Sequence, residues 1–214
     1  CYQDDFDEGI FTGKGIYDLD AFYEVLRDSI PENTVLSHDL LEGCYLRAGL
    51  ASDILLLDGY PSNYEAYKTR NKRWIRGDVQ ILPWIKSKLN FLSKYKILDN
   101  VVRTSGEIFL SIALLSGFIF KIPKLVWVSI LIIATPTIIE LLDLLFGDDT
   151  RFDHSKLFVP YSSKWKKSIY LFFVNLGNII DSAVVSIESI AKACYRMKIS
   201  HSFLLEWITA EEAE

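Results

Sequence analysis

The sequence predicts an α/β polar part that is mostly helical, followed by an α-helical membrane region. Half of the 214 residues are apolar and the mean hydropathy is positive, which is high for a soluble domain and indicates membrane segments. The membrane-length apolar runs lie after residue 103, whereas helical spacings and one strand-like run at 51–62 precede them. We therefore place the polar part at 1–80 and the membrane region after it.

The net charge of −5 conceals two regions of opposite sign. Residues 1–60 hold 13 acidic and 3 basic side chains, whereas residues 61–103 hold 3 acidic and 10 basic ones. A basic band directly before an apolar region is typical of a segment that faces anionic lipid, and it also suits a phosphate-bearing ligand. We expect membrane lipids as partners and no nucleic acid, because the band is short and the whole chain is acidic.

Cysteines and histidines form no recognisable framework. Three cysteines, far apart in the sequence, give no disulfide or metal spacing, which fits a reducing compartment, and the three histidines form no ligand motif. The chain starts at Cys1, without an initiator Met or a signal peptide, so we expect a piece of a longer protein.

Two short helices are predicted in the polar part. The first has Asp18 or Asp20 as its N-cap and ends by Pro31. The second has Ser37 as its N-cap, and Gly49 stops it. A basic helical stretch rich in aromatic residues then begins near residue 63. Pro83 interrupts that stretch, and residues 81–103 are predicted as an amphipathic region at the membrane surface.

Residues 104–146 are predicted to form a tight transmembrane hairpin. About 20 apolar residues span a bilayer core, and two such runs are joined here by the short link "KIPK". A polar loop at 147–167 and an amphipathic or transmembrane helix at 168–191 follow, and residues 192–214 form a tail. The basic flanks outnumber the two lysines of the link, so the positive-inside rule places residues 1–103 and 147–167 in the cytoplasm.

The helix at 168–191 carries one polar stripe whose members recur every three or four residues. This stripe faces either the interface or other transmembrane helices. Its members are Asn175, Asn178, Ser182, Ser186 and Ser189.

Two motifs carry the chemistry. "SHD" places Asp39 at a helix start, where the N-terminus favours a negative side chain, and "RNKRW" follows with Arg70, Arg73 and Trp74. Taken alone, Asp39 is more commonly a first-turn acid, and an Arg-Trp pair is more commonly an interface anchor. Their order, followed by membrane helices, resembles the second half of an inverting, processive glycosyltransferase of the cellulose synthase type. His38 stands where that pattern commonly has Glu, and Arg70 where it commonly has Gln.

A narrower resemblance covers almost the whole chain. "EGIFTGKGIYDLDAF", "PENTVLSHDLLEGCYLRAGLASDI", "RNKRWIRGDVQILPW" and "LLEWITA" resemble the cyclic β-1,2-glucan synthase family of bacterial inner-membrane proteins. The resemblance implies that residues 1–80 are the C-terminal part of a GT-A glycosyltransferase domain. It also implies UDP-glucose and a growing glucan as partners.

The resemblance also assigns roles to individual residues. Asp39 would be the general base that deprotonates the acceptor hydroxyl, and Arg73, with Arg70, would stabilise the diphosphate leaving group. Trp74 offers a flat face for a glucose ring, and Lys14, between two glycines, would reach a phosphate. His38 is expected either to orient Asp39 or to have no role.

The resemblance places other parts of the enzyme outside this chain. These are an upstream donor-binding half, whose ligands hold a divalent metal (Mg²⁺ or Mn²⁺), and a downstream phosphorylase-like domain. We therefore expect the parent protein to be a hexosyltransferase and this chain alone to be inactive. Two alternatives are another processive synthase, of cellulose or hyaluronan type, and a non-catalytic membrane assembly module.

Overall fold

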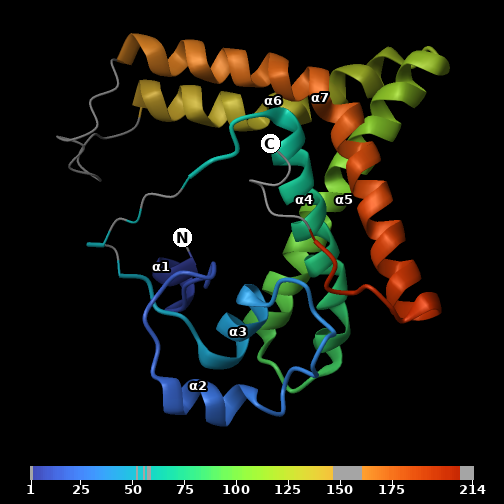
Figure 1. Cartoon of the computed structure of the whole chain (residues 1–214). Helices are drawn as coiled ribbons and strands as arrows, with labels where there is room; N and C mark the ends of the chain where they lie inside the picture. The colour runs from blue at the N-terminus through green and yellow to red at the C-terminus, as the bar shows by residue number, and fades with distance from the viewer. Residues whose placement is uncertain (1, 52, 55, 57–58, 147–160, 208–214) are drawn as a thin grey trace. The chain divides into compact units, whose positions relative to one another are not determined.

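The computed structural model describes the chain except for residues 1, 52, 55, 57–58, 147–160 and 208–214 (Figure 1). Two compact units form, the first from residues 1–105 and 185–214, the second from residues 106–184. The helices are α1 (Tyr2–Phe6), α2 (Leu19–Leu26), α3 (Asp39–Leu46), α4 (Tyr64–Gln80), the 3₁₀ turn η1 (Leu82–Lys86), α5 (Phe91–Ile119), α6 (Pro123–Phe146), α7 (Tyr161–Tyr195) and the π-helical turn η3 (Arg196–Ser200).

The described residues form no β-strand, so the strand predicted at 51–62 is not formed where this stretch is described. Ile54 and Leu56 are more than half exposed there. A strand needs a neighbouring strand for its backbone hydrogen bonds, and the described part of this chain supplies none. What the structure shows is therefore a helical polar part followed by long apolar helices.

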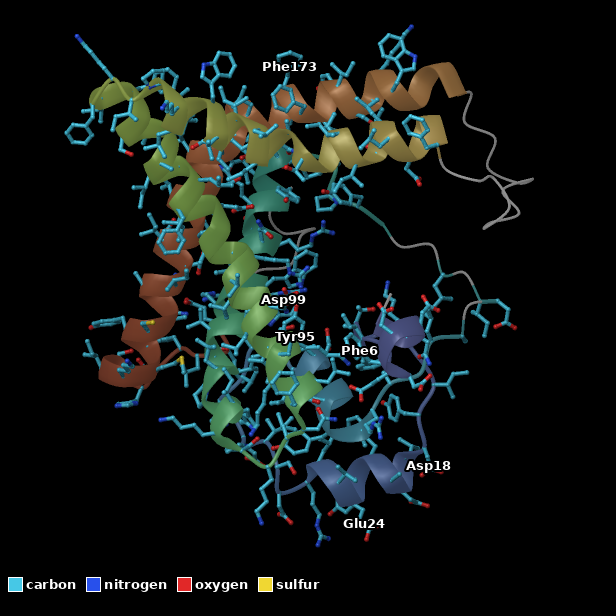
Figure 2. The ribbon with its side chains drawn as sticks, turned by 180° about the vertical axis from the view of Figure 1, so that it is seen from behind. Phe6, Asp18, Glu24, Tyr95, Asp99 and Phe173 are labelled. Atoms are coloured by element: carbon cyan, nitrogen blue, oxygen red, sulfur yellow. The ribbon has the colours of Figure 1, made fainter. Side chains whose placement is uncertain are left out.

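Helix α2 starts where the sequence predicts. The Asp18 carboxylate accepts a hydrogen bond from the Ala21 backbone N–H at 2.9 Å, which satisfies one of the free amides of the first turn. Figure 2 shows Asp18 at this end of the helix and Glu24 further along it. The helix ends at Leu26, earlier than Pro31.

Both predicted ends of the second helix were wrong. The N-cap of α3 is His38, which makes no side-chain capping bond, and Ser37 instead lies against Gly77 of α4. The helix ends at Leu46 because Arg47 turns into a positive φ of 61°, so Gly49 does not stop it.

The core of the first unit joins α3 to the residues on either side of η1. Leu41 and Ile97 are fully buried in it, and Leu89 is nearly so. Residues 81–103 consequently form η1 and the first turns of α5, and part of their apolar surface packs on α3 rather than facing lipid. The remaining members of the cluster are Val35, Cys44 and Ile81.

A buried ion pair ties the N-terminal segment to α5. The Lys96 Nζ lies 2.6 Å from a Glu8 carboxylate oxygen and also donates to the Gly9 carbonyl at 2.8 Å. The Arg47 Nε donates to the other Glu8 oxygen at 3.0 Å. Burial raises the pKa of Glu8, but the hydrogen bonds and charges of Lys96 and Arg47 outweigh it and leave that pKa below its usual value.

The second unit contains a tight helical hairpin followed by α7. Gly117 allows α5 and α6 to meet, because a Cβ there would lie 2.8 Å from the Val126 side chain. Leu114, Ile133 and Ile179, one from each long helix, form the buried core. The Ser111 hydroxyl donates to the Ile179 carbonyl at 2.8 Å, a polar contact typical of packed apolar helices.

Among the residues that the structure describes, three helices are long and apolar enough to cross a membrane, namely Phe91–Ile119, Pro123–Asp143 and Trp165–Ser200. Large apolar side chains lie exposed along them, including Trp127 at 69%. The third helix begins at Tyr161, inside the predicted loop, while residues 147–160 of that loop lie outside the described residues. Along its polar stripe, Ser186 and Ser189 are buried, whereas Asn175 is exposed.

Replacing Lys96 by Met should leave the buried Glu8 carboxylate paired with Arg47 alone and destabilise the first unit by about 1.5–3 kcal/mol, the cost of a lost hydrogen bond to a charged group. Because the pKa of Glu8 is lowered, the pair stabilises the fold above about pH 4.5, and this contribution is lost as the pH falls through the folded-state pKa. Hydrogen–deuterium exchange of residues 3–15 should accelerate. Lys94→Met, on the same helix, is the control, and equal exchange in both variants would contradict the assignment.

Candidate functional site

The loop of residues 12–15, here called the glycine loop, lies directly against the start of α3. Gly13 has a φ of +83°, and a Cβ there would lie 2.9 Å from an Asp39 carboxylate oxygen. Only glycine combines that backbone conformation with such close approach. The half-buried Asp39 carboxylate therefore contacts the loop backbone, while the side chain of Lys14 is exposed to solvent.

His38 pairs with Glu42 rather than orienting Asp39. Its Nδ1 lies 2.6 Å from the Glu42 carboxylate, one helical turn further on. That hydrogen bond raises the pKa of His38, and the charges of Glu42 and Asp39 act in the same direction. The Glu42 side chain is only 12% exposed, so it is a largely buried partner of His38 rather than a solvated helix residue.

The same three side chains lie close together. Ligand atoms of His38, Asp39 and Glu42 lie within 4.8 Å of one another, close enough to hold a cation. In this arrangement Nδ1 of His38 is engaged by the Glu42 carboxylate. The cluster is an ion pair beside one remaining carboxylate, that of Asp39.

Helix α4 is fastened to the residues that lead into Asp39. A Cβ on Gly77 would lie 2.9 Å from the Ser37 Cβ, so this glycine permits close contact. The Leu36 backbone N–H donates to the Gln80 side-chain oxygen at 2.7 Å, and Gln80 is 2% exposed. Since Arg73 precedes Gly77 by about one helical turn, these contacts bring the "RNKRW" helix and the Asp39 segment together.

The arginines of α4 are held mainly by aromatic rings. The Arg70 guanidinium lies 4.7 Å from the ring centroids of both Tyr60 and Trp74, and that of Arg73 lies 4.8 Å from Trp207. Trp74 keeps 43% of its surface exposed. The Nε atoms of Arg70, Arg73 and Arg76 are buried without a hydrogen-bond partner. A cation stacked on a ring keeps its charge, so this helix face stays positive.

Arg76 is the most buried of these arginines. It is 8% exposed, and its Nη2 donates to the Glu206 backbone carbonyl at 2.6 Å. Burial lowers the pKa of Arg76, and the nearby charge of Arg196 adds to this effect. Sequence reasoning missed Arg76, although the spacing of Arg70, Arg73 and Arg76 every three residues was a usable signal.

Two further residues of this site are not marked by any such spacing in the sequence. Gln80 and Trp207 reach this site from the end of α4 and from the C-terminal tail, and each is recognisable only once the chain is folded. The contacts described join the segment before Asp39 to α4 at Gly77 and Gln80, and the roles of Asp39, Arg70, Arg73 and Trp74 stay predictions.

Comparison with known proteins shows what the whole chain is similar to. The whole chain is 35% identical, over 229 aligned residues, to the cyclic β-(1,2)-glucan synthase NdvB of Rhizobium meliloti (strain 1021). This chain is related to the cyclic β-1,2-glucan synthases. It spans about 8% of the length of that relative, so it corresponds to one segment of such a synthase. No protein-family model matches the chain.

The His38–Glu42 pair should be detectable by titration. In this chain, NMR of ¹³C-labelled histidine should give His38 a pKa above 6.5, and Glu42→Gln should lower it. Because the folded-state pKa is raised, the pair stabilises the fold below about pH 6.5 and loses this effect as the pH rises through that pKa. His201, outside the pair, is the internal reference. A His38 titration unchanged by the substitution would contradict the pairing.

Proposed function

We propose that this chain is part of a membrane-bound inverting glucosyltransferase that uses UDP-glucose to build a β-1,2-glucan. Relatedness to a cyclic β-1,2-glucan synthase along the whole chain supports the glucosyltransferase class. The observation that carries the assignment to residues is the half-buried carboxylate of Asp39, held against the Gly13 backbone. The segment before it is fastened to the cationic helix α4.

The proposed reaction is a single displacement. The Asp39 carboxylate takes the proton of the acceptor hydroxyl as its oxygen attacks the anomeric carbon of the donor glucose. The bond from that carbon to the diphosphate oxygen breaks, and UDP leaves with the bonding pair. Arg73 and Arg70 stabilise the charge that develops on the diphosphate. Attack from the opposite face inverts the anomeric centre and gives a β-linkage.

The remaining predicted site residues have subsidiary roles in this proposal. The exposed face of Trp74 offers a stacking surface for a glucose ring. The Arg70 guanidinium lies 4.7 Å from the centroid of the same Trp74 ring. Lys14, in the glycine loop, would reach a donor phosphate. His38 neutralises Glu42, which leaves Asp39 as the carboxylate of the cluster that is available to accept a proton.

The proposal places the other parts of the enzyme outside this chain. We assign the divalent metal of the enzyme to a donor-binding half that precedes these residues. A phosphorylase-like domain follows them. On this proposal, residues 1–80 complete a GT-A domain, residues 1–103 face the cytoplasm at a bacterial inner membrane, and the isolated chain is inactive.

Asp39→Asn in the full-length protein should lower the rate of glucan synthesis about 10²- to 10⁴-fold, because an amide cannot accept the proton. Asp20→Asn, also in the first turn of a helix, is the matched control. Incorporation of labelled glucose from UDP-glucose into β-1,2-glucan measures the effect in membranes with equal protein content. Unchanged synthesis would rule out Asp39 as the base, and a β-1,4-linked product would favour the cellulose-type alternative.

Gly13→Ala should also reduce synthesis, by about tenfold or more, because the new Cβ displaces the Asp39 carboxylate or the loop. The positive φ adds about 1–2 kcal/mol of backbone strain. The control is Gly49→Ala, since a Cβ at Gly49 meets nothing within 4 Å. Equal activity in the two variants would show that loop contact with Asp39 is unimportant for the reaction.

A further inference from the structure

The C-terminal tail of the chain runs along α4. After η3, His201 and Phe203 adopt positive φ angles of 47° and 55°, and the chain turns back toward the helix. The Gln80 side-chain amide donates to the Leu204 carbonyl at 3.0 Å, and Arg76 donates to the Glu206 carbonyl at 2.6 Å. Figure 1 shows this red stretch beside α4.

These two contacts hold the path of the tail through its backbone. Gln80 and Arg76 are 2% and 8% exposed, so neither can exchange its tail carbonyl for water without opening the structure. Gln80 also accepts from the Leu36 backbone N–H, so the same side chain binds the tail and the segment that leads to Asp39. A displacement of the tail would therefore act, through Gln80, on α4 and on the segment that leads to Asp39.

Arg196 fixes the tail from its other end. Its Nη1 donates to the Phe203 carbonyl at 2.6 Å, and its Nη2 pairs with the Glu206 carboxylate. That ion pair engages the Glu206 carboxylate, which would otherwise compete for the arginines of α4. It also lowers the pKa of Glu206, so the pair persists through the neutral pH range.

Trp207 is the tail residue that meets the proposed catalytic helix. Its ring centroid lies 4.8 Å from the Arg73 guanidinium, and the ring is 48% exposed. Within the residues that the structure describes, Arg73 has no carboxylate partner. An aromatic ring orients a guanidinium without neutralising it and leaves its N–H edge available to an anion.

We propose that Trp207 is a positioning residue that holds the Arg73 guanidinium ready for the diphosphate of the donor. This inference rests on the proposed glucosyltransferase function. The tail serves as a clamp, in which Gln80, Arg76 and Arg196 fix residues 203–206 and Trp207 acts on Arg73. The chain after the last long helix thereby becomes part of the donor site.

The first test measures the contact itself, without any activity. Phenylglyoxal modifies accessible guanidinium groups, and mass spectrometry of peptides from the full-length protein gives the extent at each arginine. Trp207→Ala should raise modification of Arg73 several-fold, whereas Trp207→Phe, which keeps a ring, should stay near wild type.

Arg103, with a 66% exposed side chain, is the internal reference. Leu205→Ala, which shortens another side chain of the same tail, is the control variant. Unchanged modification of Arg73 in Trp207→Ala would overturn the proposal.

The second test measures how the contact affects the donor site. Trp207→Ala should raise the KM for UDP-glucose about tenfold, the factor expected for loss of one oriented cation contact of roughly 1.4 kcal/mol, and Trp207→Phe should recover most of it. A purely structural role would lower the yield of active enzyme and leave KM unchanged. An unchanged KM in active enzyme would therefore overturn the positioning role.

If Arg73 modification responds but wild type makes no glucan from UDP-glucose, the proposed function fails and the Trp207–Arg73 contact stands.

Discussion

The Gln80 side chain joins three segments of the first unit that are far apart in sequence. It accepts a hydrogen bond from Leu36 at 2.7 Å and donates one to Leu204 at 3.0 Å, and it is almost fully buried. A buried amide that satisfies two backbone groups is costly to remove, because both groups would then lack partners. The position of α4 therefore depends on the Gln80 side chain, and so do the positions of the arginines that α4 carries.

This arrangement solves a problem of like charges. Arg70, Arg73 and Arg76 recur on one helix, and Arg196 approaches from the end of α7. Acidic partners would stabilise such a cluster but would also cancel its field. Aromatic rings and backbone carbonyls hold most of these groups instead, so the positive charge remains available for an anionic ligand. Positive charge kept on one helix face without carboxylate partners for Arg70 and Arg73 is consistent with the proposed diphosphate contact.

Local signals in the sequence predicted the parts of the fold that depend on neighbouring residues. The Asp18 cap, the basic helix from Asn63 and the two apolar helices around the "KIPK" turn follow from capping, periodicity and length. Ser37 failed as an N-cap because its place is decided by Gly77, forty residues later. The clamp of the tail was not predictable either, because backbone carbonyls that accept hydrogen bonds carry no sequence signature.

The position of Asp39 separates a capping role from a chemical one. An acid that stabilises a helix does so best at the N-cap, where it accepts from the free N–H groups, but that position belongs to His38. Asp39 follows it and lies against Gly13, and among the described residues it forms no ion pair or side-chain hydrogen bond. Glu42, the neighbouring acid, is already occupied by His38. A general base needs a free lone pair, and in this cluster the half-buried Asp39 is the carboxylate without an ion-pair partner, which supports its proposed role.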